Sequence, residues 1–148
     1  MLPPAHAHMT AIPVSVSADF AISRLSCAEF VGGWSLGSMG LQPVAPGVWR
    51  GRSLFDGSEA HVEIRARADL GIIDYAVGNS ERRSPGIFIR VTSGETLGFS
   101  ADCCLVALHA MRAAAADDAR WARTCTAHEA EILLIKAQLE RAFAGAVG

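Results

Sequence analysis

Residues 48–77 read VWRGRSLFDGSEAHVEIRARADLGIIDYAV. Apolar and charged residues alternate through most of this stretch, and the alternation is interrupted at Asp56-Gly57 and at Asp69-Leu70. A period of two is the side-chain period of a strand with one covered face, and Asp-Gly suits the positive φ angles of a tight hairpin turn. The stretch therefore predicts a β-meander with two hairpin turns.

Each turn fixes a register for its hairpin. If Phe55 lies opposite Ser58, then Arg50 falls opposite Glu63, and a turn at Asp69-Leu70 places Arg65 opposite Asp74. Both registers predict one charged face and one apolar face. The residues expected to face inward are Trp49, Val62, Ile64, Ile73, Tyr75 and Val77, and those expected to face outward are Arg50, Glu63, Arg65 and Asp74.

Further strands are expected on both sides of the meander. Residues 14–20 alternate like a first strand, and residues 26–29 read Ser-Cys-Ala-Glu, a capping box that predicts a short helix. Residues 34–47 mix glycine and proline with apolar residues and are expected to form a connection with little regular structure. Residues 78–86 are expected to be an exposed loop with solvated arginines. Residues 87–92 and 103–111 complete a sheet of about six strands.

A long amphipathic helix is expected after Asp117 and Asp118, whose charge favours a helix N-terminus. Gly145 can end it, which gives a span of about 27 residues. Glu129 and Glu131 are expected to point away from its apolar stripe. That stripe consists of Trp121, Cys125, His128, Ile132, Ile135, Leu139 and Phe143.

Composition limits the function classes. The net charge of −2 gives no general attraction to nucleic acid, and charges interrupt every apolar run before the ~20 residues that a membrane span needs. Residues 1–10 are expected to be disordered and residues 11–148 to form a single domain. Residues 1–10 lack the pattern of a secretory signal, so a cytoplasmic location is expected, with the four cysteines reduced.

The order of these elements resembles the START-like, or Bet v 1-like, superfamily. The segments that carry the resemblance are residues 14–20, 47–51, 71–75 and the helix of residues 121–143. The resemblance implies an α+β helix-grip fold, in which a curved antiparallel sheet wraps around a long C-terminal helix and leaves a cavity. Members of the superfamily include polyketide cyclase-like proteins, lipid and hormone binders, and stress-response chaperone helpers.

Tyr75 and His128 are the first candidates for polar groups in such a cavity. The Tyr75 hydroxyl, on the covered face, could bond a ligand or polarise a carbonyl; as a core tyrosine it would instead bond to the backbone. A neutral His128 imidazole could exchange a proton with a bound substrate near neutral pH, or it could be a satisfied core histidine.

Four further residues complete the candidate ligand site. His109 faces the ligand or points outward, depending on the register of its strand. Trp34 either gates the cavity or caps the core, and Trp49 and Ile132 are expected in the apolar wall. The sequence assigns no catalytic residue, and neither a metal nor a cofactor is expected, because His61, His109 and His128 share no ligand spacing.

Three functions remain open from the sequence. The first is binding of a small hydrophobic or aromatic molecule between the sheet and the helix. The second is a cyclase- or dehydrase-like enzyme in which Tyr75, His128 or His109 moves a proton. The third is an interaction protein, a homodimer for example, whose core is filled by its own side chains.

Overall fold

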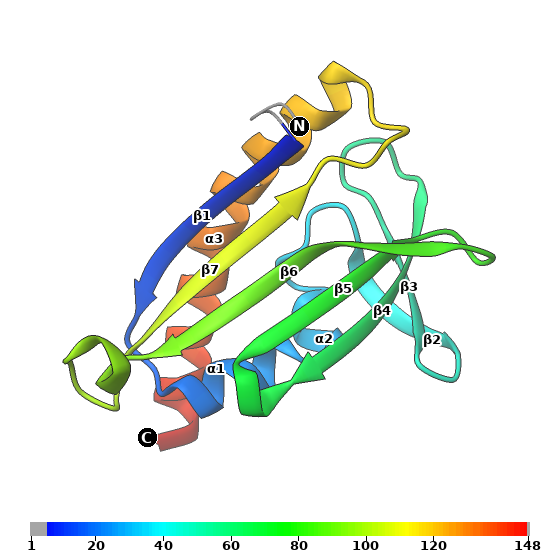
Figure 1. The fold of residues 1–148 in the computed structure, drawn as a ribbon. Helices are drawn as coiled ribbons and strands as arrows, with labels where there is room; N and C mark the ends of the chain where they lie inside the picture. The colour runs from blue at the N-terminus through cyan, green and yellow to red at the C-terminus, as the bar shows by residue number, and fades with distance from the viewer. Residues whose placement is uncertain (1–5, 148) are drawn as a thin grey trace.

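In the computed structural model, which describes residues 6–147, a curved antiparallel sheet lies against one long helix (Figure 1). The sheet order among these residues is β1-β7-β6-β5-β4-β3-β2. The strands are β1 (Ala7–Val14), β2 (Met39–Ala45), β3 (Val48–Arg52), β4 (Glu59–Arg67), β5 (Ile72–Gly78), β6 (Arg83–Ser93) and β7 (Cys104–Met111). The helices are α1 (Ala18–Leu25), α2 (Ala28–Val31) and α3 (Asp118–Val147).

This arrangement confirms the predicted α+β helix-grip fold. The sheet has seven strands instead of about six, because β2 forms within the stretch expected to be irregular. Pro43 lies in β2 opposite Trp49, and the β2–β3 register shifts on both sides of it. Since β2 is an edge strand with bulges, it tolerates a residue that lacks a backbone N–H.

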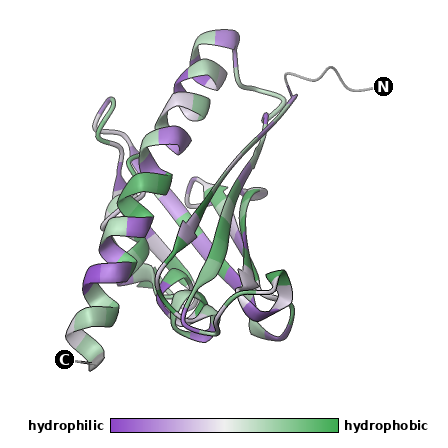
Figure 2. Ribbon diagram, turned by 90° about the vertical axis from the view of Figure 1, so that its left-hand side faces the viewer, coloured by the Kyte–Doolittle hydropathy of each residue, from purple (hydrophilic) through white to green (hydrophobic). Residues whose placement is uncertain are grey.

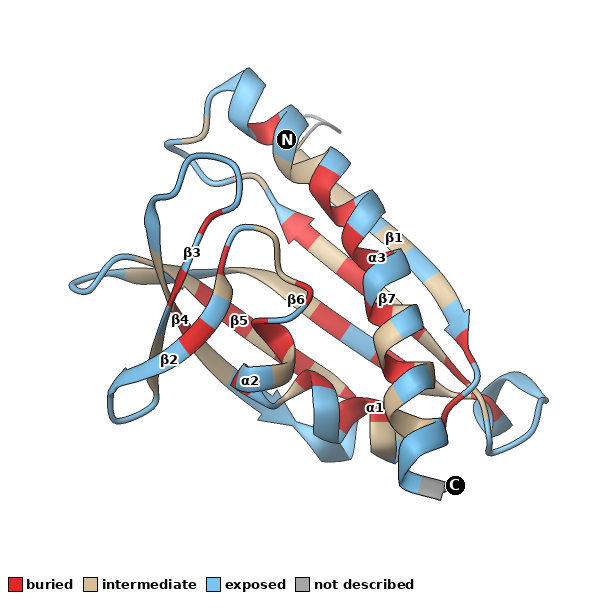
Figure 3. Cartoon of the chain, turned by 180° about the vertical axis from the view of Figure 1, so that it is seen from behind, coloured by how far each residue is buried: buried red, intermediate tan, exposed pale blue. Residues whose placement is uncertain are grey.

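The core lies between the concave face of the sheet and α3. Figure 2 shows α3 running beside the sheet as a second layer, and Figure 3 shows buried positions recurring along the helix. A strand buries every second residue and a helix every third or fourth, so the two layers meet along matching apolar surfaces. The fully buried side chains include Val106, Leu108, Ile89, Ile73, Ile135 and Leu139.

The two predicted hairpin registers have different outcomes. The β4–β5 register is confirmed, since Arg65 lies opposite Asp74. Its turn depends on Gly71, whose φ is 65° and where a Cβ atom would lie 2.4 Å from the Val91 carbonyl oxygen. Although Arg65 lies opposite Asp74, its ion pair is with Glu63 of its own strand, at 3.5 Å.

The β3–β4 register is wrong by two residues, because Arg50 lies opposite His61 instead of Glu63. The loop is longer than a two-residue turn: the Ser53 N–H donates to the Ser58 carbonyl, which leaves four residues between them. Asp56 holds this loop by accepting from both the Ser58 N–H and its hydroxyl. A shift of two keeps each side chain on its predicted face, because strand side chains alternate with a period of two.

The predicted strand at residues 14–20 and the predicted capping box are also wrong. The strand ends at Val14, and the Ser17 hydroxyl caps α1 by accepting from the Phe20 N–H. Ser26 lies at the C-terminal end of α1, where its hydroxyl donates to the Ile22 carbonyl, so it does not begin α2. A serine hydroxyl bonds nearby backbone at either end of a helix, and the sequence pattern alone did not separate the two ends.

The segment expected to be disordered at residues 1–10 is ordered in part. Residues 1–5 lie outside the described residues, whereas Ala7 to Thr10 form the start of β1 and pair with β7. His8 contacts Glu129 of α3, with 2.9 Å between Nε2 and Oε1. Backbone pairing with Leu108 to Met111 of β7 orders these four residues, from Ala7 to Thr10.

The exposed loop expected at residues 78–86 is shorter than predicted, because β6 already begins at Arg83. The Arg83 guanidinium is not solvated as expected: its Nε donates to the Glu63 carboxylate at 2.9 Å. That bond links β6 to β4 across the intervening β5.

Candidate functional site

A cavity of about 650 Å³ lies between the N-terminal half of α3, the α2–β2 connection and the sheet. This volume falls in the range of sites for small molecules. Apolar lining comes from side chains of α2, β4, β5 and β6 together with aromatic rings, and polar lining comes mainly from α3 and the β3–β4 loop. The lining includes Val31, Trp34, Ser35, Ser38, Ser53, Phe55, Asp56, Ser58, Glu59, Ala60, Val62, Tyr75, Val77, Ile87, Asp117, Arg120, Arg123, Thr124, Ala127, His128 and Glu131.

Glu131 is the functional candidate that the sequence prediction missed. It was expected to point away from the apolar stripe, but it is 5% exposed and lines the cavity. The spacing already contained the signal, since Glu131 is three residues after His128 and four before Ile135, and such positions share a helix face.

The environment of Glu131 raises its pKa to about 8, and the cause is burial. No hydrogen bond or ion pair reaches its carboxyl from the other residues that the structure describes. A carboxyl without a cationic partner is harder to ionise when it leaves water. Glu131 is therefore mostly protonated at neutral pH, and it can donate a hydrogen bond or a proton inside the cavity.

His128 lies on α3 one turn before Glu131 and also lines the cavity, as the sequence predicted for a ligand contact. Burial, with a smaller contribution from His8, lowers its pKa to about 4, so the imidazole is neutral at pH 7. The His8 ring stands edge-on to it with 6.3 Å between the ring centroids. The Nδ1 atom of His128 is buried with no hydrogen-bond partner among residues 6–147. The cavity thus contains an acid and a base whose pKa values are displaced in opposite directions.

Tyr75 also lines the cavity, but its hydroxyl is occupied. The hydroxyl donates to the Leu25 carbonyl at 2.6 Å, which is the core-tyrosine alternative raised by the sequence. Burial holds its pKa well above 10. Tyr75 therefore contributes its ring to the wall and ties α1 to the sheet.

Trp34 belongs to the α2–β2 connection and packs beside Tyr75 of β5. Its ring is edge-on to the Tyr75 ring with 6.0 Å between centroids, and only 2% of the residue is exposed. Its Nε1–H is buried without an acceptor among the described residues. Trp34 thus lines the cavity and packs in the core at the same place.

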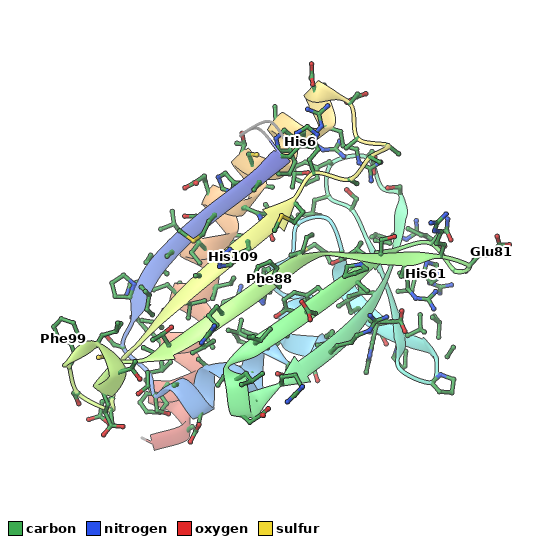
Figure 4. All side chains as sticks on the ribbon, in the orientation of Figure 1. His6, His61, Glu81, Phe88, Phe99 and His109 are labelled. Carbon is green, nitrogen blue, oxygen red and sulfur yellow. The ribbon has the colours of Figure 1, made fainter. Side chains whose placement is uncertain are left out.

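Three predicted site residues lie outside the cavity lining. His109 is on the opposite face of the sheet from α3, where its ring stacks on Phe88 with 4.3 Å between centroids (Figure 4). This placement corrects the candidate site, and the reason is strand alternation: Leu108 and Ala110 occupy the buried face of β7. Trp49 and Ile132 pack with the core and do not line the cavity.

The entrance of the cavity carries charged side chains from two elements. Asp56 and Glu59 come from the β3–β4 loop and the start of β4, and Arg120 and Arg123 come from the first turns of α3. The Arg123 guanidinium lies over the Phe55 ring, 4.7 Å from its centroid. Hydrogen bonds from Ser58 hold the pKa of Asp56 below its usual value. The polar entrance and the apolar interior together suit an amphipathic ligand.

Within residues 6–147, no three His, Cys, Asp or Glu side chains lie close enough together to hold a metal ion. No helix in the same part of the chain is long and apolar enough to cross a membrane.

Comparisons with known proteins identify the fold. No protein-family model matches the chain, and no curated protein matches its sequence. Among solved structures, a START superfamily protein from Mycobacterium smegmatis superimposes with a TM-score of 0.60 at 13% identity, covering 95% of this chain and 99% of that one. The Aha1 dimer from Colwellia psychrerythraea gives a TM-score of 0.65 at 13% identity, with 90% and 96% covered.

A third similar structure is the di-domain ARO/CYC StfQ from the steffimycin biosynthetic pathway. Its TM-score is 0.62 at 12% identity, and the match covers 90% of this chain and 44% of StfQ. This chain therefore corresponds to less than half of that di-domain protein. At such identities the likeness concerns the backbone arrangement and not the ligand. The chain has the START-like, Bet v 1-like helix-grip fold that its sequence resembles.

Proposed function

We propose that this protein binds a small, largely apolar or aromatic molecule in the cavity between the sheet and α3. The observation that carries the proposal is the 650 Å³ cavity, with its aromatic and aliphatic wall and the buried side chains of His128 and Glu131. In this proposal Trp34 and Tyr75 contact the body of the ligand, and the two α3 residues orient its polar group.

Physical chemistry supports an apolar body for the ligand. Burying an aromatic group the size of a Phe or Trp side chain removes roughly 150–250 Å² from water, worth about 4–6 kcal/mol. Part of this gain offsets the loss of translational and rotational freedom on binding. A few polar contacts then fix orientation, because leaving a buried donor or acceptor unpaired is unfavourable. The cavity also argues against the filled core on which the homodimer hypothesis depends.

The test is to fill the cavity and measure binding. Ala127 is buried and lines the cavity, whereas Ala130 is exposed on the same helix and does not line it. The probe is 2-naphthamide, and its affinity is measured by titration calorimetry. We expect Ala127→Leu to weaken binding at least tenfold and Ala130→Leu to leave it unchanged. Equal affinity in both variants would show that the probe binds elsewhere.

A second candidate function is acid–base catalysis in the same cavity, and the opposite pKa displacements of Glu131 and His128 favour it. Pairs of titratable groups displaced in this way are typical of sites that move protons. The fold is shared with the ARO/CYC protein StfQ, which is consistent with either binding or cyclase-like chemistry. If the protein is an enzyme, a ligand that co-purifies with Glu131→Gln protein is expected to be converted when wild-type protein is added, as followed by mass spectrometry.

A further inference from the structure

We infer that the molecule bound in this cavity carries a positively charged nitrogen, and that the Glu131 carboxylate is its counter-ion. This inference rests on the proposed function and narrows the ligand to amphipathic cations, such as aromatic amines or amidines. It depends on the placement of one acidic side chain and on the balance of charge around the cavity.

Glu131 is the acidic group on the inner part of the wall. Only 5% of the residue is exposed, and no Lys, Arg or His forms an ion pair with it among the residues described. Even Glu63 of β4, which lies on the outer face of the sheet and is only partly buried, is held by Arg83 at 2.9 Å. Buried carboxylates in folded proteins are normally paired. Glu131 has no such partner among the described residues, so the position of the cation is available to a positively charged group of the ligand.

The charges of the residues that line the cavity also favour a cationic ligand. Carboxyl groups of Asp56, Glu59, Asp117 and Glu131 line the cavity, against the guanidinium groups of Arg120 and Arg123. Arg123 is already engaged with the Phe55 ring at the entrance. An excess of acidic groups around a concave, poorly solvated site attracts cations and repels anions. A cationic head group is therefore favoured over a carboxylate or phosphate.

A neutral ligand would make a weaker match. A carbonyl could accept a hydrogen bond from protonated Glu131, but a charge-assisted bond between an amidinium and a carboxylate is about twice as strong as a neutral one. The aromatic walls given by Trp34 and Tyr75 also suit a flat organic cation, since a ring face attracts positive charge. The combination of one unpaired acid with aromatic rings distinguishes this cavity from a purely apolar one.

The experiment compares three probes of nearly the same shape: 2-naphthamidine, 2-naphthamide and 2-naphthoate. They are cationic, neutral and anionic, respectively, and affinities are measured by titration calorimetry at pH 8 on the full chain. We expect the amidine to bind at least tenfold more tightly than the amide, and the naphthoate to bind most weakly. Glu131→Gln should reduce the preference for the amidine to less than threefold while it leaves binding of the amide intact.

Glu129→Gln is the matched control, because Glu129 is exposed two residues away on α3 and does not line the cavity. It should keep the full preference for the amidine. A preference that survives Glu131→Gln, or that is lost equally in Glu129→Gln, would overturn the assignment of Glu131.

The pH dependence of the wild-type protein provides a test that needs no variant. The pKa of Glu131 in the empty cavity is about 8, so the fraction ready to bind a cation rises by up to about a hundredfold between pH 6 and pH 9. His128, with its pKa near 4, and Tyr75, with its pKa well above 10, keep their charge over this range. Affinity for the amidine should therefore increase with pH, whereas affinity for the amide should not.

The outcomes separate this inference from the proposed function. If the amide binds as tightly as the amidine at every pH, and Ala127→Leu still blocks binding, the inference of a cationic ligand is wrong and the proposed binding in the cavity is supported. If none of the three probes binds, both the cation preference and the binding of aromatic molecules of this size are wrong.

Discussion

The two halves of α3 face the same sheet, but one half packs closely against it and the other half lines a cavity. In the C-terminal half, Ile135 and Leu139 are completely buried against the sheet and α1. In the N-terminal half, Ala127, His128 and Glu131 face a cavity. A close-packed layer stabilises the fold through contacts along its whole surface, whereas a cavity gives up such contacts. One helix therefore combines a half that packs against the sheet with a half that lines a cavity.

Hydrogen bonds reinforce the packed half. The Lys136 ammonium donates to the Pro13 carbonyl at 3.0 Å, and the Glu140 carboxylate accepts from the Ser15 N–H at 2.9 Å. Gln138 donates to the Gly33 carbonyl at 2.8 Å from the other side of the helix. These bonds tie the packed half to the end of β1 and to the segments that follow β1 and α2. The cavity half is held by other contacts, between Glu129 and His8 and between Asp118 and Arg112.

The largest expected effect comes from removing a side chain in the packed half. Leu139→Ala should lower the free energy of unfolding by about 4 kcal/mol, because it deletes buried methyl groups and leaves a void. Leu133→Ala, at a position that is 59% exposed on the same helix, should change it by less than about 0.5 kcal/mol. Chemical denaturation of both variants checks this, and similar losses would mean that α3 is not anchored by its C-terminal half.

The next effect comes from the buried acid in the cavity half. Burial raises the pKa of Glu131 in the folded state to about 8, so its stabilising contribution is present below pH 4.5 and is lost as the pH rises through 8. Glu131→Gln should therefore stabilise the protein by roughly 4 kcal/mol more at pH 9 than at pH 5. Denaturation curves at the two pH values test this, and a pH-independent difference would contradict the burial of the charge.

His128 should produce a smaller effect of the opposite sign. Because its folded-state pKa is lowered to about 4, the wild-type protein loses stability as the pH falls from 6.5 toward 4. His128→Leu should remove this loss. The free energy of unfolding of the variant, relative to that of the wild type, should be about 2 kcal/mol greater at pH 5 than at pH 7.5. Thermal unfolding at both pH values checks the difference. An unchanged pH profile would place His128 in water.

The smallest expected effect is the difference in stability between two overpacking variants, one beside the packed half and one at the cavity. Ala21, completely buried beside the packed half, and Ala127, at the cavity wall, are matched small residues in helices. Ala21→Leu should cost about 2 kcal/mol through overpacking, whereas Ala127→Leu should change stability by less than about 1 kcal/mol because the cavity has room. Equal losses, measured by denaturation, would indicate that the cavity is closed in solution.

Much of the fold was predictable because it depends on local patterns. Alternation in residues 48–77 identified the meander and the face of each side chain, and these faces survived a two-residue error in one hairpin register. The acidic start of α3 and its apolar stripe were also predicted correctly. The first strand was misplaced because alternation at residues 14–20 fits an extended chain as well as a helix that begins at Ala18.

The candidate site was only partly predictable. Trp34, Tyr75 and His128 line the cavity as expected, whereas His109, Trp49 and Ile132 do not. Glu131 was expected to point away from the apolar stripe, as charged residues on a helix usually do, since they are rarely buried without a partner. That rule holds on average and fails where a cavity supplies space beside the side chain.

The sequence alone was enough to predict the periods of the meander strands and of α3 and which of their side chains share a face, because these follow from the geometry of each element. The tertiary structure was needed to see where the two layers separate into a cavity, that the Tyr75 hydroxyl donates to the Leu25 carbonyl, and that Glu131 is enclosed without a partner among the described residues. These properties depend on distances between segments far apart in the chain, which no local pattern specifies.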